Sequence, residues 1–399
     1  MTNNLSRRNF LLTCSGACLW AALGGGTGLV RPAGAAESQK SVGRVHVFKD
    51  NAPDELWKWS REAFSYEKLA GGKVTCNVCP NHCTLSVGDR SICRSKVNMD
   101  GKLYTLAYGN PCSVHVDPIE KKPLFHFLPQ SRVFSMAATG CSFRCLNCQN
   151  WEISQVRPEE VRHYDLFPEA AVERALRTNT RAIAYTYSEP LTFFEYMMDT
   201  ARIARQKDVK NLLISNGYVN REPLLDLCRV LDAANINLKS FDDKLYLKLN
   251  GGRLQPVLDT FKTLDEQNVH FEMTTLLVPG YVDDPDMIRD MCKWITDNLG
   301  VNHPLHFLRF YPHYKLDRLP PTPVPAMEQM REIAMEEGIR YVYIGNVPGH
   351  EANHTYCHNC EKMIIERQGY EISAAGLSGG RCRFCDTEIP GVWNEKDKT

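Results

Sequence analysis

Three tight groups of cysteines are the residues of this sequence that could do chemistry. The chain has 16 cysteines, and most of them lie in three groups: Cys76, Cys79, Cys83 and Cys93; then Cys141, Cys145 and Cys148; then Cys357, Cys360, Cys382 and Cys385. Disulfide frameworks spread their cysteines along a small chain, whereas short gaps of this kind place several thiolates on one metal centre. The sequence therefore indicates metal chemistry before any other kind.

The central group, in the loop CSFRCLNCQNW (141–151), is the group that predicts catalysis. Three cysteine ligands on a [4Fe–4S] cube leave one iron without a protein ligand. That iron can chelate the amino and carboxylate groups of S-adenosyl-L-methionine (SAM). An electron delivered through this contact can split the sulfonium and release a 5′-deoxyadenosyl radical. A zinc site with a distant fourth ligand is the alternative that spacing alone leaves open.

The last group forms two Cys-x2-Cys knuckles, CHNC (357–360) and CRFC (382–385). Two such knuckles are typical of a zinc ribbon, in which four thiolates surround one tetrahedral zinc ion. Because the tail has little core of its own, a metal would supply its folding energy. Zinc is favoured here, and rubredoxin-like iron or a pair of disulfides are the alternatives.

The first group has the sequence CNVCPNHC (76–83) followed by Cys93. These gaps suit either zinc or a second iron–sulfur cluster. A second cluster could relay electrons or bind substrate, whereas zinc would hold the module together. A structural metal site is the favoured interpretation, and the iron–sulfur cluster stays open beside it.

The elements that must position these loops alternate between short apolar runs and amphipathic stretches from Val133 onward. This alternation predicts parallel strands with helical crossovers, in a barrel or an open sheet. Strands are expected at 133–139, 182–187, 211–215, 236–241, 271–278, 305–310 and 341–345, and helices near 168–178, 190–206, 222–234, 254–267, 285–299 and 326–337. Reactive groups of such folds gather at the carboxyl ends of the strands. One shared site is therefore expected to contain the residues that follow the strands: Cys141, Glu189, Asn216, Asp242, Asp243, Pro279, Gly280, Tyr311, His313 and Asn346.

The cysteine loop and several strand-end motifs together resemble the radical SAM superfamily over residues 133–349. YTYSEP (185–190) looks like the superfamily's Gly-Gly-Glu-Pro stretch, which meets the SAM amino group. SNGY (215–218) and YVYIGNVPG (341–349) are similar to segments of pyruvate formate-lyase-activating enzymes. Longer matches resemble the AmmeMemoRadiSam system radical SAM proteins, and they include DPIEKKPLFHF (117–127), FLRFYP (307–312) and both outer cysteine groups.

The resemblance implies an α/β fold with a partial (β/α)6 radical SAM barrel. It implies a catalytic [4Fe–4S] cluster on the central cysteines, and SAM bound by Tyr187, Ser188, Glu189, Asn216 and Asn346. The superfamily usually has an aromatic residue where Asn147 stands, so Trp151 is expected to supply the stacking.

Four parts of the chain are expected. They are a signal over 1–36, an N-terminal helix and Cys-rich module over 37–132, the radical SAM core over 133–350, and a zinc-ribbon-like tail over 351–399. The amphipathic stretch at 50–70 predicts the N-terminal helix.

The predicted function is reductive cleavage of SAM followed by abstraction of hydrogen from a substrate. The likeness to glycyl-radical activating enzymes suggests a protein substrate, such as a backbone glycine, and a small molecule stays open. A low-potential electron donor is the partner that this chemistry requires. The alternative is a non-catalytic iron–sulfur or zinc protein, either an electron carrier or a scaffold. A zinc hydrolase is disfavoured because the sequence lacks a His-Glu-x-x-His motif.

The charge balance excludes one class of partner, and the N-terminal residues predict a location. Lys+Arg and Asp+Glu both total 47, so no global field would recruit nucleic acid. Arg7-Arg8, an apolar stretch to Val30 and an Ala33-x-Ala35 site resemble a twin-arginine export signal. This predicts a periplasmic location, with a cytoplasmic one as the alternative. Glycines 24–26 make the apolar stretch a poor membrane anchor, so no stable anchor is expected.

Overall fold

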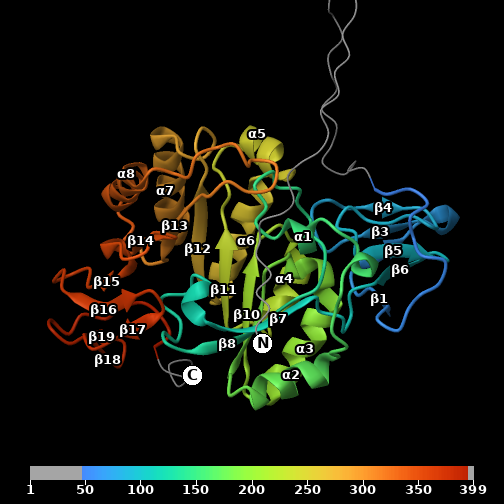
Figure 1. Cartoon of the computed structure of the whole chain (residues 1–399), viewed down its shortest axis with the longest axis horizontal. Helices are drawn as coiled ribbons and strands as arrows, with labels where there is room; N and C mark the ends of the chain where they lie inside the picture. Colours follow the sequence, from blue (N-terminus) through green and yellow to red (C-terminus); the bar gives the residue numbers. More distant parts are fainter. Residues whose placement is uncertain (1–46, 394–399) are drawn as a thin grey trace, which may run out of the picture. The chain divides into compact units, whose positions relative to one another are not determined.

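The computed structural model describes residues 47–393, in which one eight-stranded sheet forms the largest element (Figure 1). The strand order is β14-β13-β12-β11-β10-β9-β8-β7. Strands β8 to β14 are parallel neighbours in chain order, and β7 is an antiparallel edge strand. Their bounds are β7 Ser113–Pro118, β8 Arg132–Ala137, β9 Ala182–Tyr185, β10 Lys210–Ser215, β11 Ala233–Asn237, β12 His270–Leu277, β13 Leu305–Arg309 and β14 Val342–Gly345. The expected export signal lies outside the described residues.

Helical crossovers join the parallel strands, as the alternating pattern predicted. The long helices are α2 Pro168–Arg177, α3 Phe194–Gln206, α4 Arg221–Cys228, α6 Gln255–Glu266, α7 Pro285–Leu299 and α8 Val324–Glu336. Helix packs on helix in chain order within the pairs α2–α3, α4–α6, α6–α7 and α7–α8, which places these helices beside one another in a layer outside the sheet (Figure 1). The mostly parallel α/β fold is confirmed, and the closure of the sheet into a partial barrel stays a prediction.

Alternate residues of the strands face opposite sides of the sheet, as the period of two requires. On one side, apolar residues of β12 to β14 join the core beneath the helices: Met273, Leu277, Leu305, Phe307 and Ile344. Their neighbours along the same strands line a cavity on the other side: Leu276, His306, Leu308, Tyr343 and Gly345. A one-residue slip in register would exchange the two sets, so burial of the apolar set fixes which residues face the cavity.

The predicted helix over residues 50–70 is wrong. That segment contains the short strands β1 (Arg61–Glu62) and β2 (Tyr66–Lys68) and no α-helix. Its backbone groups bond across to a neighbouring hairpin: the Ala63 amide donates to the Leu103 carbonyl at 2.8 Å, and Trp59 accepts from Tyr108 at 3.1 Å. Long-range pairing therefore overrides the amphipathic pattern, which was the only signal for a helix.

The N-terminal module consists of two small antiparallel sheets, β1-β6-β5 and β2-β3-β4. The remaining strands are β3 Val74–Cys76, β4 Thr84–Leu85, β5 Lys96–Met99 and β6 Lys102–Thr105. A buried ion pair joins this module to the core, because Lys96 Nζ lies 2.6 and 2.7 Å from the two carboxylate oxygens of Glu195 on α3. The two side chains are 2% and 0% exposed.

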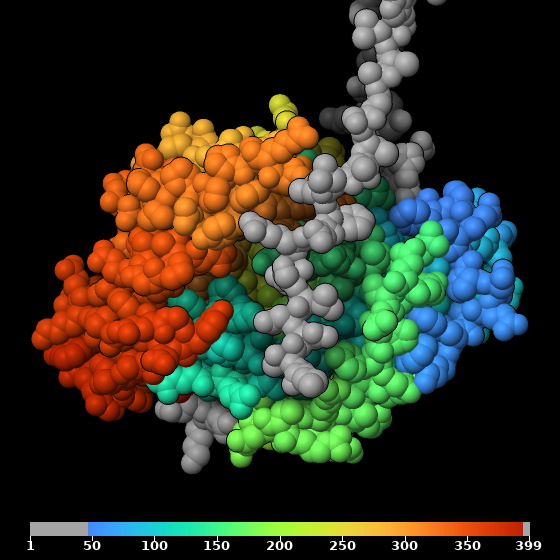
Figure 2. Space-filling view, viewed as in Figure 1, coloured from blue at the N-terminus to red at the C-terminus, as the bar shows by residue number. Residues whose placement is uncertain are grey.

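The C-terminal module contains the strands β15 Thr355–Tyr356, β16 Met363–Gln368, β17 Glu371–Ser373, β18 Leu377–Ser378 and β19 Arg381–Cys382. In the space-filling view this red module lies against the teal segment that precedes β8 (Figure 2). The backbone amide of Leu128 in that segment donates to Val392 at 2.7 Å, and the Gln130 side chain donates to Ile372 at 2.9 Å. The tail is therefore docked on the core.

We predict that replacing Lys96 by Met lowers the free energy of unfolding by about 3–5 kcal/mol, because it leaves the buried Glu195 carboxylate without its cation. Urea denaturation of the purified protein measures this. The double variant Lys96→Met/Glu195→Leu removes both charges and should recover most of the loss. A double variant that is less stable than Lys96→Met would contradict this account of the pair.

Candidate functional site

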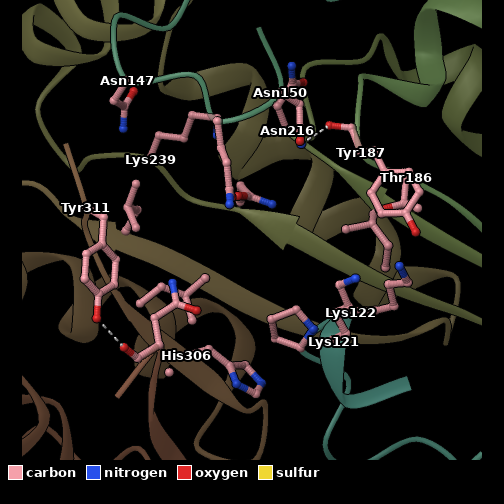
Figure 3. Close-up of a pocket in the computed structure, with 18 of the residues that line it drawn as sticks. Lys121, Lys122, Asn147, Asn150, Thr186, Tyr187, Asn216, Lys239, His306 and Tyr311 are labelled. Carbon is pink, nitrogen blue, oxygen red and sulfur yellow. Dashed lines mark hydrogen bonds between the residues drawn. The ribbon is translucent and has the colours of Figure 1, made fainter. Parts of the chain in front are cut away.

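A cavity of about 1000 Å³ lies at the carboxyl ends of the parallel strands. Five of the predicted strand-end residues line it: Cys141, Glu189, Asn216, Tyr311 and Asn346. Cys145 and Cys148 from the same loop also line it. Figure 3 shows Asn147 and Asn150 of the loop on one side of this cavity, with Lys121, Lys122 and His306 on the opposite side. The structure thus brings the central cysteines to the same cavity as the strand-end segments that resemble SAM-binding motifs.

Backbone hydrogen bonds anchor the cysteine loop to a neighbouring turn of the chain. Arg144 and Leu146 donate amide hydrogen bonds to the carbonyls of Asn250 and Leu249, at 2.8 and 2.9 Å. These acceptors end a π-helical turn, η5 (Tyr246–Asn250), whose widened geometry is often found at functional sites. The Phe143 amide donates to Cys141 Sγ at 3.3 Å. The cysteines are therefore presented on a fixed loop.

Burial makes the three thiols poor acids in the absence of a metal. It raises the pKa of Cys141 well above its usual value, that of Cys145 to about 11, and that of Cys148 in the same direction. A metal ion reverses this preference, since a coordinating thiol is deprotonated outright. Three half-buried thiols on one short loop at a cavity wall are a donor set that fits a [4Fe–4S] cluster with one open iron.

Glu189 links the loops that follow β9 and β10. Its carboxylate accepts from the Ser215 hydroxyl at 2.7 Å, from the Asn216 amide at 2.9 Å and from the Leu191 amide at 3.2 Å. The Asn216 side chain in turn donates to the Ser142 hydroxyl at 3.0 Å. Burial raises the pKa of Glu189. The carboxylate therefore aligns the loops around the cysteines and still lines the cavity.

Tyr187 and Ser188 occupy the predicted positions, and their hydroxyls bond to the protein. The Tyr187 hydroxyl donates to Asp117 and the Ser188 hydroxyl donates to the Ala138 carbonyl. Tyr187 has a φ of 64°, which turns its carbonyl toward Asn150, whose amide donates to it at 2.7 Å. Both hydroxyls therefore have protein partners, and the Tyr187 carbonyl ties this stretch to the cysteine loop.

Several cationic side chains line the same cavity. Lys122 Nζ lies 2.7 Å from Asp117 Oδ2, and Lys121 Nζ lies 3.0 Å from Asp117 Oδ1. Burial lowers the pKa of Lys122 to about 8, although Asp117 opposes the shift. Lys239 follows β11 and also lines the cavity, near Glu189 and Cys145 (Figure 3). Anionic groups are therefore the complementary ligands.

Other sequence expectations were wrong. Trp151 does not line the cavity, because its ring stacks on Tyr314 with centroids 5.3 Å apart. Asp242 and Gly280 line a separate hollow of about 650 Å³. Asp243 pairs with Arg253 at 2.6 Å. The loops after β11 and β12 therefore line the cavity only at their first residues, Lys239 and Val278, and the loop residues beyond them lie outside it.

The C-terminal module supplies cavity residues that sequence reasoning missed. Arg367, Gly369 and Tyr370, from β16 and the turn after it, line the cavity. The Arg367 guanidinium is held by the Phe125 carbonyl at 2.9 Å and by the Thr355 hydroxyl at 2.7 Å. No sequence motif marked these residues, because only the docking of the tail brings them to the site.

The C-terminal cysteines form a compact metal-ligand set. The sulfur atoms of Cys357, Cys360, Cys382 and Cys385 all lie within 4.8 Å of one another. The structure has free thiols at all cysteines of residues 47–393, which contradicts the disulfide alternative. The first group, Cys76 to Cys93, lies in the N-terminal module and outside the cavity lining.

Comparisons with known proteins indicate the family of this chain. A family model described as the radical SAM superfamily matches residues 137–295. An uncharacterised protein of Methanocaldococcus jannaschii is 46% identical over 331 residues, which cover 82% of this chain and 98% of that protein. The pyruvate formate-lyase 1-activating enzyme of Escherichia coli K12 is 26% identical over 218 residues, covering 51% of this chain and 89% of the enzyme.

Among solved structures, that of a radical SAM methyltransferase from Sphaerobacter thermophilus covers 72% of this chain and 76% of its own, with 11% identity and a TM-score of 0.45. The chain belongs to the radical SAM superfamily, as the sequence predicted. Within residues 47–393, none of the helices combines the length and the apolar character that crossing a bilayer would need.

We predict that Glu189→Gln lowers the free energy of unfolding by about 1–3 kcal/mol, because the amide nitrogen must then face one of the three donors that now point at the carboxylate. Thermal and urea unfolding measure the loss. Glu152→Gln, at an exposed position of helix α1 (Trp151–Ser154), is the matched control and should stay within about 0.5 kcal/mol of wild type. Equal effects of the two substitutions would contradict the linking role of Glu189.

Proposed function

We propose that this protein is a radical SAM enzyme whose catalytic [4Fe–4S] cluster is held by Cys141, Cys145 and Cys148. The observation that carries the proposal is the meeting of these three half-buried thiols with Glu189 and Asn216 at one cavity. When bound, the cluster would supply one electron to SAM, giving methionine and a 5′-deoxyadenosyl radical able to abstract hydrogen from a substrate.

The chain's own residues would bind and orient SAM. The backbone at Tyr187 and Ser188 and the carboxylate of Glu189 would receive the SAM ammonium, since they line the same cavity as the three cysteines. The Lys239 ammonium is complementary to the SAM carboxylate. Asn346, with a φ of 62° and a side chain donating to the Arg309 carbonyl at 3.2 Å, would lie beside the adenine.

We propose a protein substrate, presented as an extended segment with a glycine at the radical. The relative in Escherichia coli is, by its name, an activating enzyme of pyruvate formate-lyase. The cavity supports a second ligand, since ligand sites usually have about 300–1,000 Å³ and this one is at the upper end. In this proposal the parallel strands form the partial (β/α)6 barrel, and a low-potential donor supplies the electron.

Zinc at the C-terminal cysteines completes the proposal. Two of the sulfur–sulfur distances are 3.5 Å, for Cys357–Cys385, and 3.7 Å, for Cys360–Cys382. These separations match the edge of about 3.8 Å expected for four thiolates 2.3 Å from one zinc ion. The zinc would be structural, and it would hold Arg367 and Tyr370 at the cavity wall. Export by the twin-arginine-like segment belongs to the proposal as well, with a periplasmic site of action.

The first test is an anaerobic assay of the iron-reconstituted protein with SAM and dithionite. We expect 5′-deoxyadenosine from wild type and a loss of at least ~10³-fold in Cys145→Ala, because the cluster loses a ligand. Cys228→Ala, at a half-buried cysteine on α4, is the control and should keep full activity. A loaded cluster that neither binds SAM nor yields product, with or without candidate substrates, would refute the enzyme assignment in favour of an electron carrier.

A second prediction concerns the metal of the tail. Cys385→Ser should remove about one zinc ion per chain and leave the iron count unchanged. Amide exchange of residues 355–393 should then speed up, because the metal supplies much of this module's folding energy. Metal analysis and exchange mass spectrometry make the two measurements. Iron in place of zinc in the wild-type tail would reverse the metal assignment.

A further inference from the structure

The first cysteine group has the geometry of a cluster site more than that of a single-ion site. We propose that Cys76, Cys79, Cys83 and Cys93 hold a second four-iron cluster, which passes electrons singly from a low-potential protein donor to the central cluster. This inference rests on the proposed radical SAM function. It replaces the structural zinc that the sequence favoured.

The spacing of the sulfur atoms distinguishes the C-terminal cysteine group from the other two groups. Four thiolates on one zinc ion must lie about 3.8 Å apart. Within the described part of the chain, only the C-terminal cysteines form a set of three or more ligand atoms all within 4.8 Å. The first group is more widely spaced, as are the three central cysteines. Wider spacing is what a four-iron cluster demands, because each cysteine binds a different iron.

The first group is nevertheless one site. The Cys76 amide donates to the Cys83 carbonyl at 3.0 Å, which closes a turn around Cys79. The Ser91 hydroxyl lies 3.0 Å from Cys93 Sγ. Backbone amides of Val78, Asn81 and Ile92 interact favourably with the thiolate forms of Cys76, Cys79 and Cys83, respectively. Amide donors to sulfur are a means by which proteins tune cluster potentials, and the central loop has one at Cys141.

Burial and nearby positive charge suit a cluster with a net negative charge. Cys76, Cys83 and Cys93 are buried, and Cys79 is half-buried. The ammonium of Lys96 is close enough to Cys76 and Cys93 to interact with their thiolates. The guanidinium of Arg94 interacts with both Cys93 and Cys141. One cation is thus shared by the two cysteine groups.

A short path connects the two groups. A Cβ atom built on Gly140 would lie 2.5 Å from the Cys93 carbonyl oxygen, so these backbones are in direct contact. Gly140 is bonded to Cys141, which makes the path from Cys93 to the central loop one contact and one peptide. On the side of the module that faces solvent, His82 is exposed beside Cys83. Electrons can enter there and leave at Cys93.

The proposed step balances as two single-electron transfers. The donor is oxidised by one electron as the second cluster is reduced, and the second cluster is reoxidised as the central cluster is reduced. No bond is formed or broken, and no proton is moved.

Iron and sulfide counts on the full chain test whether the second cluster exists. In the variant Cys141→Ala/Cys145→Ala/Cys148→Ala we expect about four irons and four sulfides per chain, against about eight of each in wild type. The remaining iron should give an electron paramagnetic resonance signal after reduction with dithionite. A variant with no iron and about two zinc ions per chain overturns the proposal.

The relay is tested by comparing two donors. In Cys83→Ser that retains the central cluster, 5′-deoxyadenosine formation driven by a reduced flavodoxin-type protein should fall at least ~10-fold more than formation driven by dithionite. Cys112→Ser, at a cysteine outside the three groups, should behave as wild type. Equal loss with both donors, or no loss, overturns the relay. Absence of product in wild type with either donor would refute the proposed function while leaving the iron count intact.

Discussion

The site depends on the close approach of two backbones at Gly140. A Cβ at this position would lie 2.3 Å from the Ser95 hydroxyl and 2.5 Å from the Cys93 carbonyl, and the residue has a φ of +105°. Only glycine satisfies both conditions without displacing its neighbours. The N-terminal module can therefore sit directly against the loop that carries Cys141, and the hydroxyl of Ser95 donates to the Thr139 carbonyl at 2.8 Å to hold it there.

From this contact outward, the cysteine loop is fixed on three sides. The N-terminal module reaches it through Asn81, whose amide donates to the Ser142 carbonyl at 2.9 Å. The π-helical turn η5 receives its amides, and Asn216 meets it from β10. A cluster needs its ligands held in a set geometry, since a loose first shell costs function before it costs stability. The N-terminal module is thus part of the scaffold that holds the cysteine loop.

The sequence predicted the features that depend on local residue pattern and on side-chain chemistry. Strand and helix periodicity located the parallel sheet, and the carboxyl-end rule placed Glu189, Asn216 and Asn346 at the cavity. The helix predicted at residues 50–70 was wrong, because this segment pairs with a hairpin that is distant in sequence and forms strand hydrogen bonds in place of helical ones. The stacking role predicted for Trp151 was wrong for a related reason, because its observed stacking partner, Tyr314, is distant in sequence.

The contact between the C-terminal module and the core is the feature that the sequence was least able to predict. His126 is fully buried and its ring joins the core to the tail: Nδ1 donates to the Pro390 carbonyl at 2.6 Å, and Nε2 accepts from Tyr343 at 2.6 Å. Because a carbonyl can only accept, Nδ1 must carry a proton, and because burial lowers the pKa of His126 to about 3, the ring is neutral and its Nε2 is free to accept. Tyr343 lines the cavity and Pro390 belongs to the cysteine-bearing tail. The shape of the cavity wall therefore depends on whether the tail is folded, which couples the C-terminal four-cysteine group to the cavity.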